Sequence, residues 1–348
     1  MPTACILQPQ ASVHLKSRRL EIMCNDPENG NRIKAKSIPI NDLDRLIVSE
    51  FVQLSSQAVS ELLRQSVPIS ILGWNGRFLG GYLPASEPQG LFRMKQYKRS
   101  QDEVFAIHVA KQWVRAKIYN QRRVLQRLDN ARRSRESAEE KETSDETART
   151  VVSDLTKLFD ATERSASIDE TRGFEGAATA MYFRAWSTFF PPEVVFERRS
   201  TRPPLNPINA CMSFGSTIIY TEAVAFLHAH GLDPALGTLH VTENRRWSLA
   251  LDMIEPFRPA LSEALTLDLF SRQMLKPERH FEQKQGGVYL NEEGRRKFLL
   301  QYERRMERQF LSELVGHRTS LRSQLEAQAQ NYKVALDDLD RLNPFRMN

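Results

Sequence analysis

Cysteine is scarce in this chain, and its spacing matches no common cysteine-based site. Cys5, Cys24 and Cys211 are the only three among 348 residues, an odd number without a CxxC pair. Neither a disulfide framework nor a zinc ribbon is therefore supported. A reducing cytosol is the simplest environment for such a chain, and we expect a cytoplasmic protein.

Several other signatures are missing as well. No apolar run approaches the ~20 residues that a membrane span requires, and residues 1–19 lack the charged-then-apolar order of a secretory signal. The sequence contains no internal repeat, no P-loop and no GxSxG motif. These absences argue against a membrane protein, a P-loop nucleotide hydrolase and a serine hydrolase with that motif.

The remaining composition is that of an ordinary globular protein with a surplus of basic residues. Hydrophobic residues make up 41% and charged residues 26%, and 348 residues suffice for two domains with a core each. The 49 Lys and Arg exceed the 43 Asp and Glu, which gives a formal charge of +6 and a pI near 9.2. This surplus suits a polyanionic partner, although many basic proteins bind no nucleic acid.

Strand-like segments dominate the beginning of the chain, and helical periodicity follows. Short runs with strand-like alternation or extended composition are 12–15, 20–23, 33–40 and 67–72. Near Leu91 the hydrophobic period changes, and the pattern from Phe92 to Asn130 predicts a helix with Phe105, Val109 and Trp113 on its buried side. The N-terminal part therefore predicts a small strand-rich domain.

Basic residues occupy much of the rest of that predicted helix. They are Lys95, Lys98, Arg99, Lys111, Arg115, Lys117, Arg122, Arg123 and Arg127. Bases interleaved with aromatic residues can follow a phosphate backbone, but a solvated helix face is the more ordinary interpretation. The stretch from Arg132 to Thr150 has no apolar residue larger than Ala, which predicts an exposed helix end or a mobile linker.

The most informative polar residues lie between Gly231 and Pro259. From Ser248 the apolar residues recur at helical spacing, so Asp252 and Glu255, three apart, are expected to look out together from one helix face. His240 lies twelve residues before Asp252, at the end of a short apolar segment. An imidazole there can face the same space as the two carboxylates.

Glu175 is a possible fourth member of this set. Gly173 and Gly176 flank it, and without their side chains another backbone or a phosphate can approach its carboxylate. One nitrogen and two or three oxygens suit Mg²⁺ or Mn²⁺. Because these residue types are common and the spacings are long, residue types alone favour a solvated helix face and a core histidine.

Four stretches in a fixed order resemble one known family. They are RGFEGAATAMYFRAW from Arg172, RPPLNPINACMSFG from Arg202, GLDPALGTLH from Gly231 with SLALDMIEPFRP from Ser248, and FEQKQGGVYLNEEGRRKFLLQYERRM from Phe281. Together they resemble the first CRISPR-associated protein family, the metal-dependent DNA integrase and endonuclease of the CRISPR adaptation module. ILGWNGRFLGGYLP, from Ile71, is similar to the end of that family's N-terminal β domain.

The resemblance implies an α+β fold with two domains. A small N-terminal β-rich dimerisation domain, residues 1–90, precedes a larger all-α C-terminal catalytic domain, residues 91–348. It also implies an asymmetric homodimer, two of which clamp a dimer of a small ferredoxin-like partner in a heterohexamer, and no membrane. The nucleic-acid partner is double-stranded DNA, as the captured prespacer and as the CRISPR repeat. Residues 132–150 lie outside the resemblance, and Ser216 stands where an aromatic residue is common.

The site residues follow from matching positions in the family. Glu175, His240 and Glu255 resemble the ligands of Mg²⁺ or Mn²⁺, and Asp252 resembles a neighbouring acidic catalytic residue. The implied reaction inserts captured foreign DNA into the CRISPR array by attack of a 3′-hydroxyl on a phosphodiester. Among the basic residues, Arg245 and Arg246, and less strongly Arg202, are expected to contact DNA phosphates; the alternative is an ordinary exposed loop.

Two alternative functions remain open at this stage. One is a non-catalytic DNA-binding scaffold on the same fold, and the other is a stand-alone metal-dependent repair nuclease. The presence of all four residues, Glu175, His240, Asp252 and Glu255, favours the enzyme over the scaffold.

Overall fold

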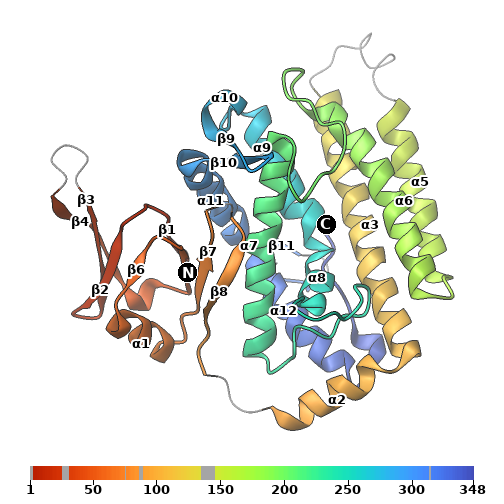
Figure 1. Cartoon of the computed structure of the whole chain (residues 1–348). Coiled ribbons are helices and arrows are strands. Elements are labelled where there is room, and N and C mark those ends of the chain that lie inside the picture. Colours follow the sequence, from red (N-terminus) through yellow and green to blue (C-terminus); the bar gives the residue numbers. More distant parts are fainter. Residues whose placement is uncertain (1–2, 26–30, 75, 86–88, 135–145, 313–314) are drawn as a thin grey trace.

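The computed structural model describes residues 3–25, 31–74, 76–85, 89–134, 146–312 and 315–348. Strands form the N-terminal part and helices most of the remainder, which confirms the predicted order (Figure 1).

The first N-terminal sheet has four strands in the order β1-β5-β7-β8. They are β1 (Thr3–Ile6), β5 (Arg45–Ser49), β7 (Ile69–Leu72) and β8 (Phe78–Tyr82). Strands β1, β5 and β7 are mutually parallel, and β8 runs antiparallel to β7. Every residue of β5 is buried, because this strand lies inside the sheet and is covered on both faces.

A second four-stranded sheet follows the order β4-β3-β2-β6. Its strands are β2 (Ser12–Lys16), β3 (Arg19–Asn25), β4 (Arg32–Pro39) and β6 (Gln53–Leu54). Leu20, Ile22 and Cys24 alternate with more exposed residues along β3, as expected for a strand with one buried face. Helix α1 (Ser56–Arg64) packs on β2 and begins at Ser55, whose hydroxyl accepts a hydrogen bond from the Ala58 amide at 3.2 Å.

The C-terminal part is largely helical. Its longer helices are α2 (Gly90–Ser100), α3 (Glu103–Arg133), α5 (Glu146–Glu163), α6 (Ile168–Trp186), α7 (Pro207–Ala229), α11 (Glu292–Glu307) and α12 (Leu321–Ala335). The shorter ones are α8 (Ser248–Ile254), the π-helical turn η3 (Pro259–Glu263), α9 (Ala264–Ser271) and α10 (Pro277–His280). Two short antiparallel pairs interrupt the helices: β9 (Phe281–Lys284) with β10 (Gly287–Leu290), and β11 (Phe310–Leu311) with β12 (Arg318–Thr319). Single 3₁₀ turns are η1 (Ile40–Asp42), η2 (Ser187–Phe189) and η4 (Leu339–Arg341).

The predicted helix from Phe92 to Asn130 is two helices rather than one. Asp102 separates α2 from α3, because its carboxylate accepts a hydrogen bond from the Phe105 amide at 3.1 Å and so begins a new helix. Helix α3 then packs along α5 and α6. Most of the charged stretch at 132–150 lies outside the described residues, so its predicted exposure is not tested.

Helix α7 runs through the middle of the helical part (Figure 1). It begins at Asn206, whose side chain accepts a hydrogen bond from the Asn209 amide at 2.8 Å, and it ends before Gly231, whose φ is +74°. The sequence predicted no apolar segment long enough for a membrane span, yet α7 meets that test by length and composition. Because 67% of its apolar window is buried inside the fold, α7 is accounted for as a core helix.

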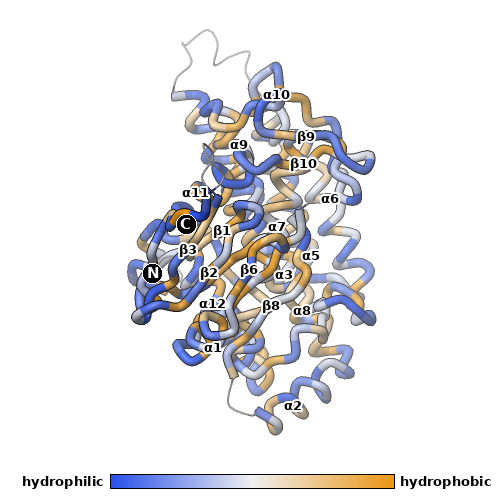
Figure 2. Tube along the Cα trace, turned by 60° about the vertical axis from the view of Figure 1, so that its left-hand side comes forward, coloured by the Kyte–Doolittle hydropathy of each residue, from blue (hydrophilic) through white to orange (hydrophobic). Residues whose placement is uncertain are grey.

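One hydrophobic core joins the first sheet to the helices. Ile47 of β5 and Leu72 of β7 belong to the same buried cluster as Phe105, Trp113 and Phe257. A second cluster, which includes Leu20, lies between the two N-terminal sheets and α1. Figure 2 shows that hydrophobic residues gather along the strands and the inner helices, and hydrophilic ones along the periphery.

Candidate active site

Glu175 lies in the middle of α6, on the side that packs against α3. The helix begins at Ser167, whose hydroxyl accepts a hydrogen bond from the Glu170 amide at 3.1 Å. The Glu175 carboxylate accepts a hydrogen bond from the Thr179 hydroxyl at 3.1 Å and contacts the Lys117 ammonium of α3. Neither Gly173 nor Gly176 has an atom within 4 Å of the position of an added Cβ, so the surface of α6 at these two glycines is open.

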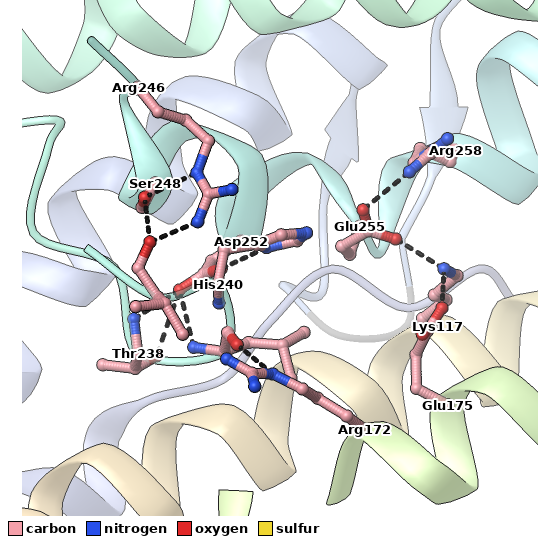
Figure 3. A network of polar contacts seen from close by, with 12 residues as sticks. Lys117, Arg172, Glu175, Thr238, His240, Arg246, Ser248, Asp252, Glu255 and Arg258 are labelled. Atoms are coloured by element: carbon pink, nitrogen blue, oxygen red, sulfur yellow. Dashed lines mark hydrogen bonds and ion pairs between the residues drawn. The ribbon is translucent and has the colours of Figure 1, made fainter. Parts of the chain in front are cut away.

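Glu255 lies at the C-terminal end of α8 and faces two cations. Its Oε2 is 2.6 Å from the Lys117 ammonium, and its Oε1 is 2.7 Å from the Arg258 guanidinium (Figure 3). Burial raises the pKa of Glu255, but Arg258 and Lys117 outweigh burial and hold that pKa well below its usual range. For Lys117, burial lowers the pKa, but Glu255 and Glu175 raise it overall, so the ammonium stays charged.

Asp252 is fully buried behind His240. One carboxylate oxygen accepts hydrogen bonds from the Thr238 and Leu239 amides at 2.6 and 2.9 Å. The other accepts from the His240 amide at 2.8 Å and lies 2.6 Å from His240 Nδ1. Because the Asp252 carboxylate accepts this hydrogen bond, Nδ1 carries the hydrogen in the neutral His240 ring, and Nε2 then keeps its lone pair for another partner.

The charge of Asp252 also sets the protonation of His240. Burial lowers the pKa of His240, but the hydrogen bond and the charge of Asp252 raise it overall. The expectation that Asp252 and Glu255 look out together is therefore wrong, since Asp252 turns to the backbone of residues 238–240 and Glu255 turns to Lys117. Of the predicted set, His240 has the most open side chain, with 33% of its surface exposed.

The donor set suits a divalent cation, although Lys117 stands among the donors. Within the described part of the chain, no three His, Cys, Asp or Glu side chains lie close enough together to hold a metal ion. The Lys117 ammonium contacts both Glu175 and Glu255, so these two carboxylates from separate helices already share one positive charge. The two carboxylates are the oxygen ligands that Mg²⁺ and Mn²⁺ prefer, and an imidazole nitrogen would shift the site toward Mn²⁺.

The three predicted DNA-contacting arginines have different surroundings. Arg202 and Arg245 line one cavity of about 500 Å³ together with Arg77 and Arg295. Arg246 is turned to its own loop instead. It donates a hydrogen bond to Ser248 at 3.2 Å (Figure 3), contacts the Val241 carbonyl and pairs with Glu243 at 3.1 Å. The structure thus brings two of the three together.

A family model described as "CRISPR associated protein Cas1" matches residues 4–304. The chain belongs to the Cas1 family. It is therefore an enzyme of the nuclease and integrase class, and the resemblance found in the sequence is confirmed.

Curated Cas1 relatives cover most of the chain. A CRISPR-associated endonuclease Cas1 from Clostridium perfringens is 29% identical over 316 residues, which span 90% of this chain and 86% of the relative. One from Thermodesulfovibrio yellowstonii is 31% identical over 283 residues, or 79% of this chain and 84% of the relative.

Solved structures share the Cas1 fold. A Cas1 protein from Thermotoga maritima superposes with a TM-score of 0.75 at 25% identity, covering 96% of this chain and 97% of that one. A casposase bound to its integration product superposes with a TM-score of 0.82 at 20% identity, covering 100% of this chain and 96% of the casposase. The predicted order, a β-rich region followed by helices, is confirmed. The C-terminal part is largely helical and not all-α as predicted, because the short strand pairs β9–β10 and β11–β12 lie between its helices.

Sequence reasoning missed three polar residues of this Cas1 site. Arg258 carried a usable signal, because it follows Glu255 by three residues, which is helical spacing. Arg172, inside a quoted motif, donates a hydrogen bond to the Leu239 carbonyl at 2.8 Å and so links α6 to the His240 loop. Lys117 carried no signal, because it is one of many bases on α3, where a solvated face is the ordinary expectation, yet it is only 4% exposed.

Proposed function

We propose that this Cas1 chain uses a divalent cation to cleave DNA and to join the 3′ end of captured foreign DNA to the edge of a CRISPR repeat. One observation carries the proposal. Glu175 and Glu255, from separate helices, meet at a single positive charge, and the charge of Glu255 acts on the His240 imidazole that Asp252 orients. That arrangement suits phosphodiester chemistry, in which negative charge accumulates at the reacting phosphate.

The ligands of Mg²⁺ or Mn²⁺ in this proposal are Glu175, Glu255 and His240 through Nε2. When bound, the ion lowers the pKa of the attacking 3′-hydroxyl and offsets charge on the phosphoryl oxygens. Asp252 keeps the His240 ring in the tautomer that presents Nε2. Arg258 holds the Glu255 carboxylate in place from its other oxygen.

The same proposal includes an assembly with partners. Residues 1–90 form the dimerisation domain of a homodimer, and two homodimers hold a ferredoxin-like partner dimer in a heterohexamer on double-stranded DNA. Two structural neighbours support this. One is a Cas6-RT-Cas1–Cas2 complex, at 23% identity and a TM-score of 0.76, and the other is a Cas1–DNA complex, at 15% identity and a TM-score of 0.55. The proposed compartment is the cytoplasm, which suits three free cysteines.

Replacing His240 tests the reaction. His240→Ala removes one donor, and we expect the joining of a DNA 3′ end to a repeat-bearing plasmid in Mn²⁺ to fall at least about 100-fold, with an unchanged melting temperature. His317→Ala, an exposed histidine, is the control. If the chain bound DNA with an affinity that neither Mn²⁺ nor His240→Ala changed, and joined no DNA, it would be a scaffold instead. Brisk cleavage without joining would indicate a repair nuclease.

The arginine cavity is proposed to hold DNA phosphates, because Arg202 and Arg245 place two guanidinium groups in one hollow. A double Arg202→Ala, Arg245→Ala variant should weaken DNA binding and make the slope of log affinity against log salt shallower by about 2. Arg64→Ala, on helix α1, is the control. An unchanged slope in the double variant would remove these residues from the DNA interface.

A further inference from the structure

Lys117 has a buried ammonium group between two acidic side chains. It projects from α3, is 4% exposed, and contacts Glu175 of α6 and Glu255 at the end of α8 (Figure 3). The distance from Nζ to Glu255 Oε2 is 2.6 Å. Three separate elements therefore meet at one positive charge.

The charges in direct contact here are paired without any added ion. Glu175 and Glu255 contribute two negative charges, and Lys117 and Arg258 contribute two positive ones. The buried Glu263 is near enough to act electrostatically on Lys117 and Arg258 as well. Burying an ammonium is unfavourable unless it is paired, and unpaired buried carboxylates are equally unfavourable. Lys117 thus provides in the metal-free chain the compensation that a bound cation provides in the proposed active enzyme.

A divalent cation and the ammonium compete for the same oxygens. An ion held by Glu175 and Glu255 would lie directly beside Nζ, and like charges at such a distance in a buried site repel strongly. Arg258 differs, since it contacts the opposite oxygen of Glu255 and can remain in place. The Lys117 ammonium can move away from the two carboxylates, because a lysine carries its ammonium on a flexible four-carbon chain.

We propose that Lys117 is a built-in counter-cation of the metal site: it holds Glu175 and Glu255 together without metal and withdraws when a divalent cation binds. The inference rests on the proposed metal-dependent function. Its consequence is that Lys117 weakens metal binding, so that the site loads only when the cation displaces the ammonium. This sets a threshold for loading that depends on the concentration of the cation.

Titration of Mn²⁺ followed by electron paramagnetic resonance tests the competition in the full chain. Lys117→Met removes the charge, and we expect the dissociation constant for Mn²⁺ to fall at least 10-fold. Lys117→Arg keeps the charge and should bind no more tightly than the parent. Lys111→Met is the matched control, because Lys111 lies on the same helix but donates to the Glu163 carbonyl, and it should change nothing.

A second variant covers the risk that Lys117→Met fails to fold. Lys117→Gln carries no charge but still donates a hydrogen bond, and it should shift Mn²⁺ affinity in the same direction. In both uncharged variants the metal-free melting temperature should drop, and Mn²⁺ should raise it more than in the parent. Equal or weaker Mn²⁺ binding in both would overturn the inference.

The outcome for the proposed function is separate. Glu175→Gln and Glu255→Gln should each abolish Mn²⁺ binding in the parent chain. If the parent binds no Mn²⁺ that depends on these residues, the metal-dependent function fails. If the parent binds Mn²⁺ through Glu175 and Glu255, and the Lys117 variants bind it with the same affinity as the parent, only the counter-cation role fails.

Discussion

Asp252 and Glu255 lie three residues apart at one short helix, yet their carboxylates have different neighbours. Asp252 accepts hydrogen bonds from the backbone amides of residues 238–240 and from the His240 ring. Glu255 contacts the two cations Lys117 and Arg258. Asp252 is therefore a positioning residue, whereas Glu255 is a candidate ligand.

An Asp252→Asn variant tests this distinction at the residue scale. The amide keeps the shape but loses the charge and one accepting atom, and DNA joining should fall about 10- to 100-fold. Asp252 raises the pKa of His240, so the ring stays protonated, with Nε2 blocked, up to a higher pH. Without that charge the pKa drops, and the acidic limb of the pH–rate profile should move to lower pH.

The control for this variant is Asp268→Asn. Asp268 pairs with Arg305 at 2.7 Å and has no contact with His240 among the described interactions. It should leave both the rate and the profile unchanged. A slower Asp252→Asn enzyme whose acidic limb stays in place would show that Asp252 does not act through the protonation of His240.

At the scale of elements, the segment at Phe345 packs against the residues that follow α8. Asn120 of α3 donates to the carbonyls of Pro256 and Phe345 at 2.7 and 3.0 Å. Gln328 of α12 donates to the Met253 carbonyl at 2.5 Å and accepts from the Phe345 amide at 2.8 Å. The same two amide side chains thus bond both residues 253–256, at the end of α8, and Phe345.

Truncating Phe345 should loosen that arrangement. Its ring stacks on Phe257 at 4.5 Å between centroids, so Phe345→Ala should lower the free energy of unfolding by about 3–5 kcal/mol. DNA joining should fall as well, since α8 loses its support. Leu300→Ala, at an exposed position, should stay within about 0.5 kcal/mol in the same urea titration. Equal stability of the two variants would contradict the packing argument.

At the scale of the whole molecule, a buried charge cluster joins the first sheet to three helices. Glu222 of α7 pairs with Arg45 of β5 at 2.7 Å and with Arg322 of α12 at 3.2 Å. Arg322 also pairs with Glu303 of α11 at 2.9 Å. Burial raises the pKa of Glu222, but Arg322 and Arg45 lower it overall from 4.5 to about 2.

This lowered pKa predicts acid sensitivity. Glu222 contributes its full stability above its unfolded pKa, and the contribution is lost as pH falls from about 4.5 through about 2. Glu222→Gln should remove about 3–5 kcal/mol at pH 7 and flatten the pH dependence, because the buried Arg45 guanidinium loses its paired carboxylate and Arg322 keeps only its pairs with α11. Urea unfolding from pH 7 to pH 2 measures both effects, with Glu193→Gln, at an exposed position, as the control. If the free energy of unfolding of Glu222→Gln changed with pH in parallel with that of the parent, Glu222 would not be the source of the acid sensitivity.

The strand-rich beginning and the helices after it could be predicted from the sequence alone, and so could Glu175, His240, Asp252 and Glu255 as candidate site residues. These predictions depend on local periodicity and on motifs of adjacent residues. The break at Asp102 escaped prediction, because the helical pattern continues on both sides of it.

Which charges meet depends on how distant segments pack against each other. Lys117 lies 58 residues before Glu175 in the chain, and nothing in its sequence neighbourhood distinguishes it from the other bases of α3. Its burial follows from the packing of α3 against α6 and α8. Whether a charged side chain is solvated or paired depends on which helix faces it, and that is decided by packing between segments distant in sequence.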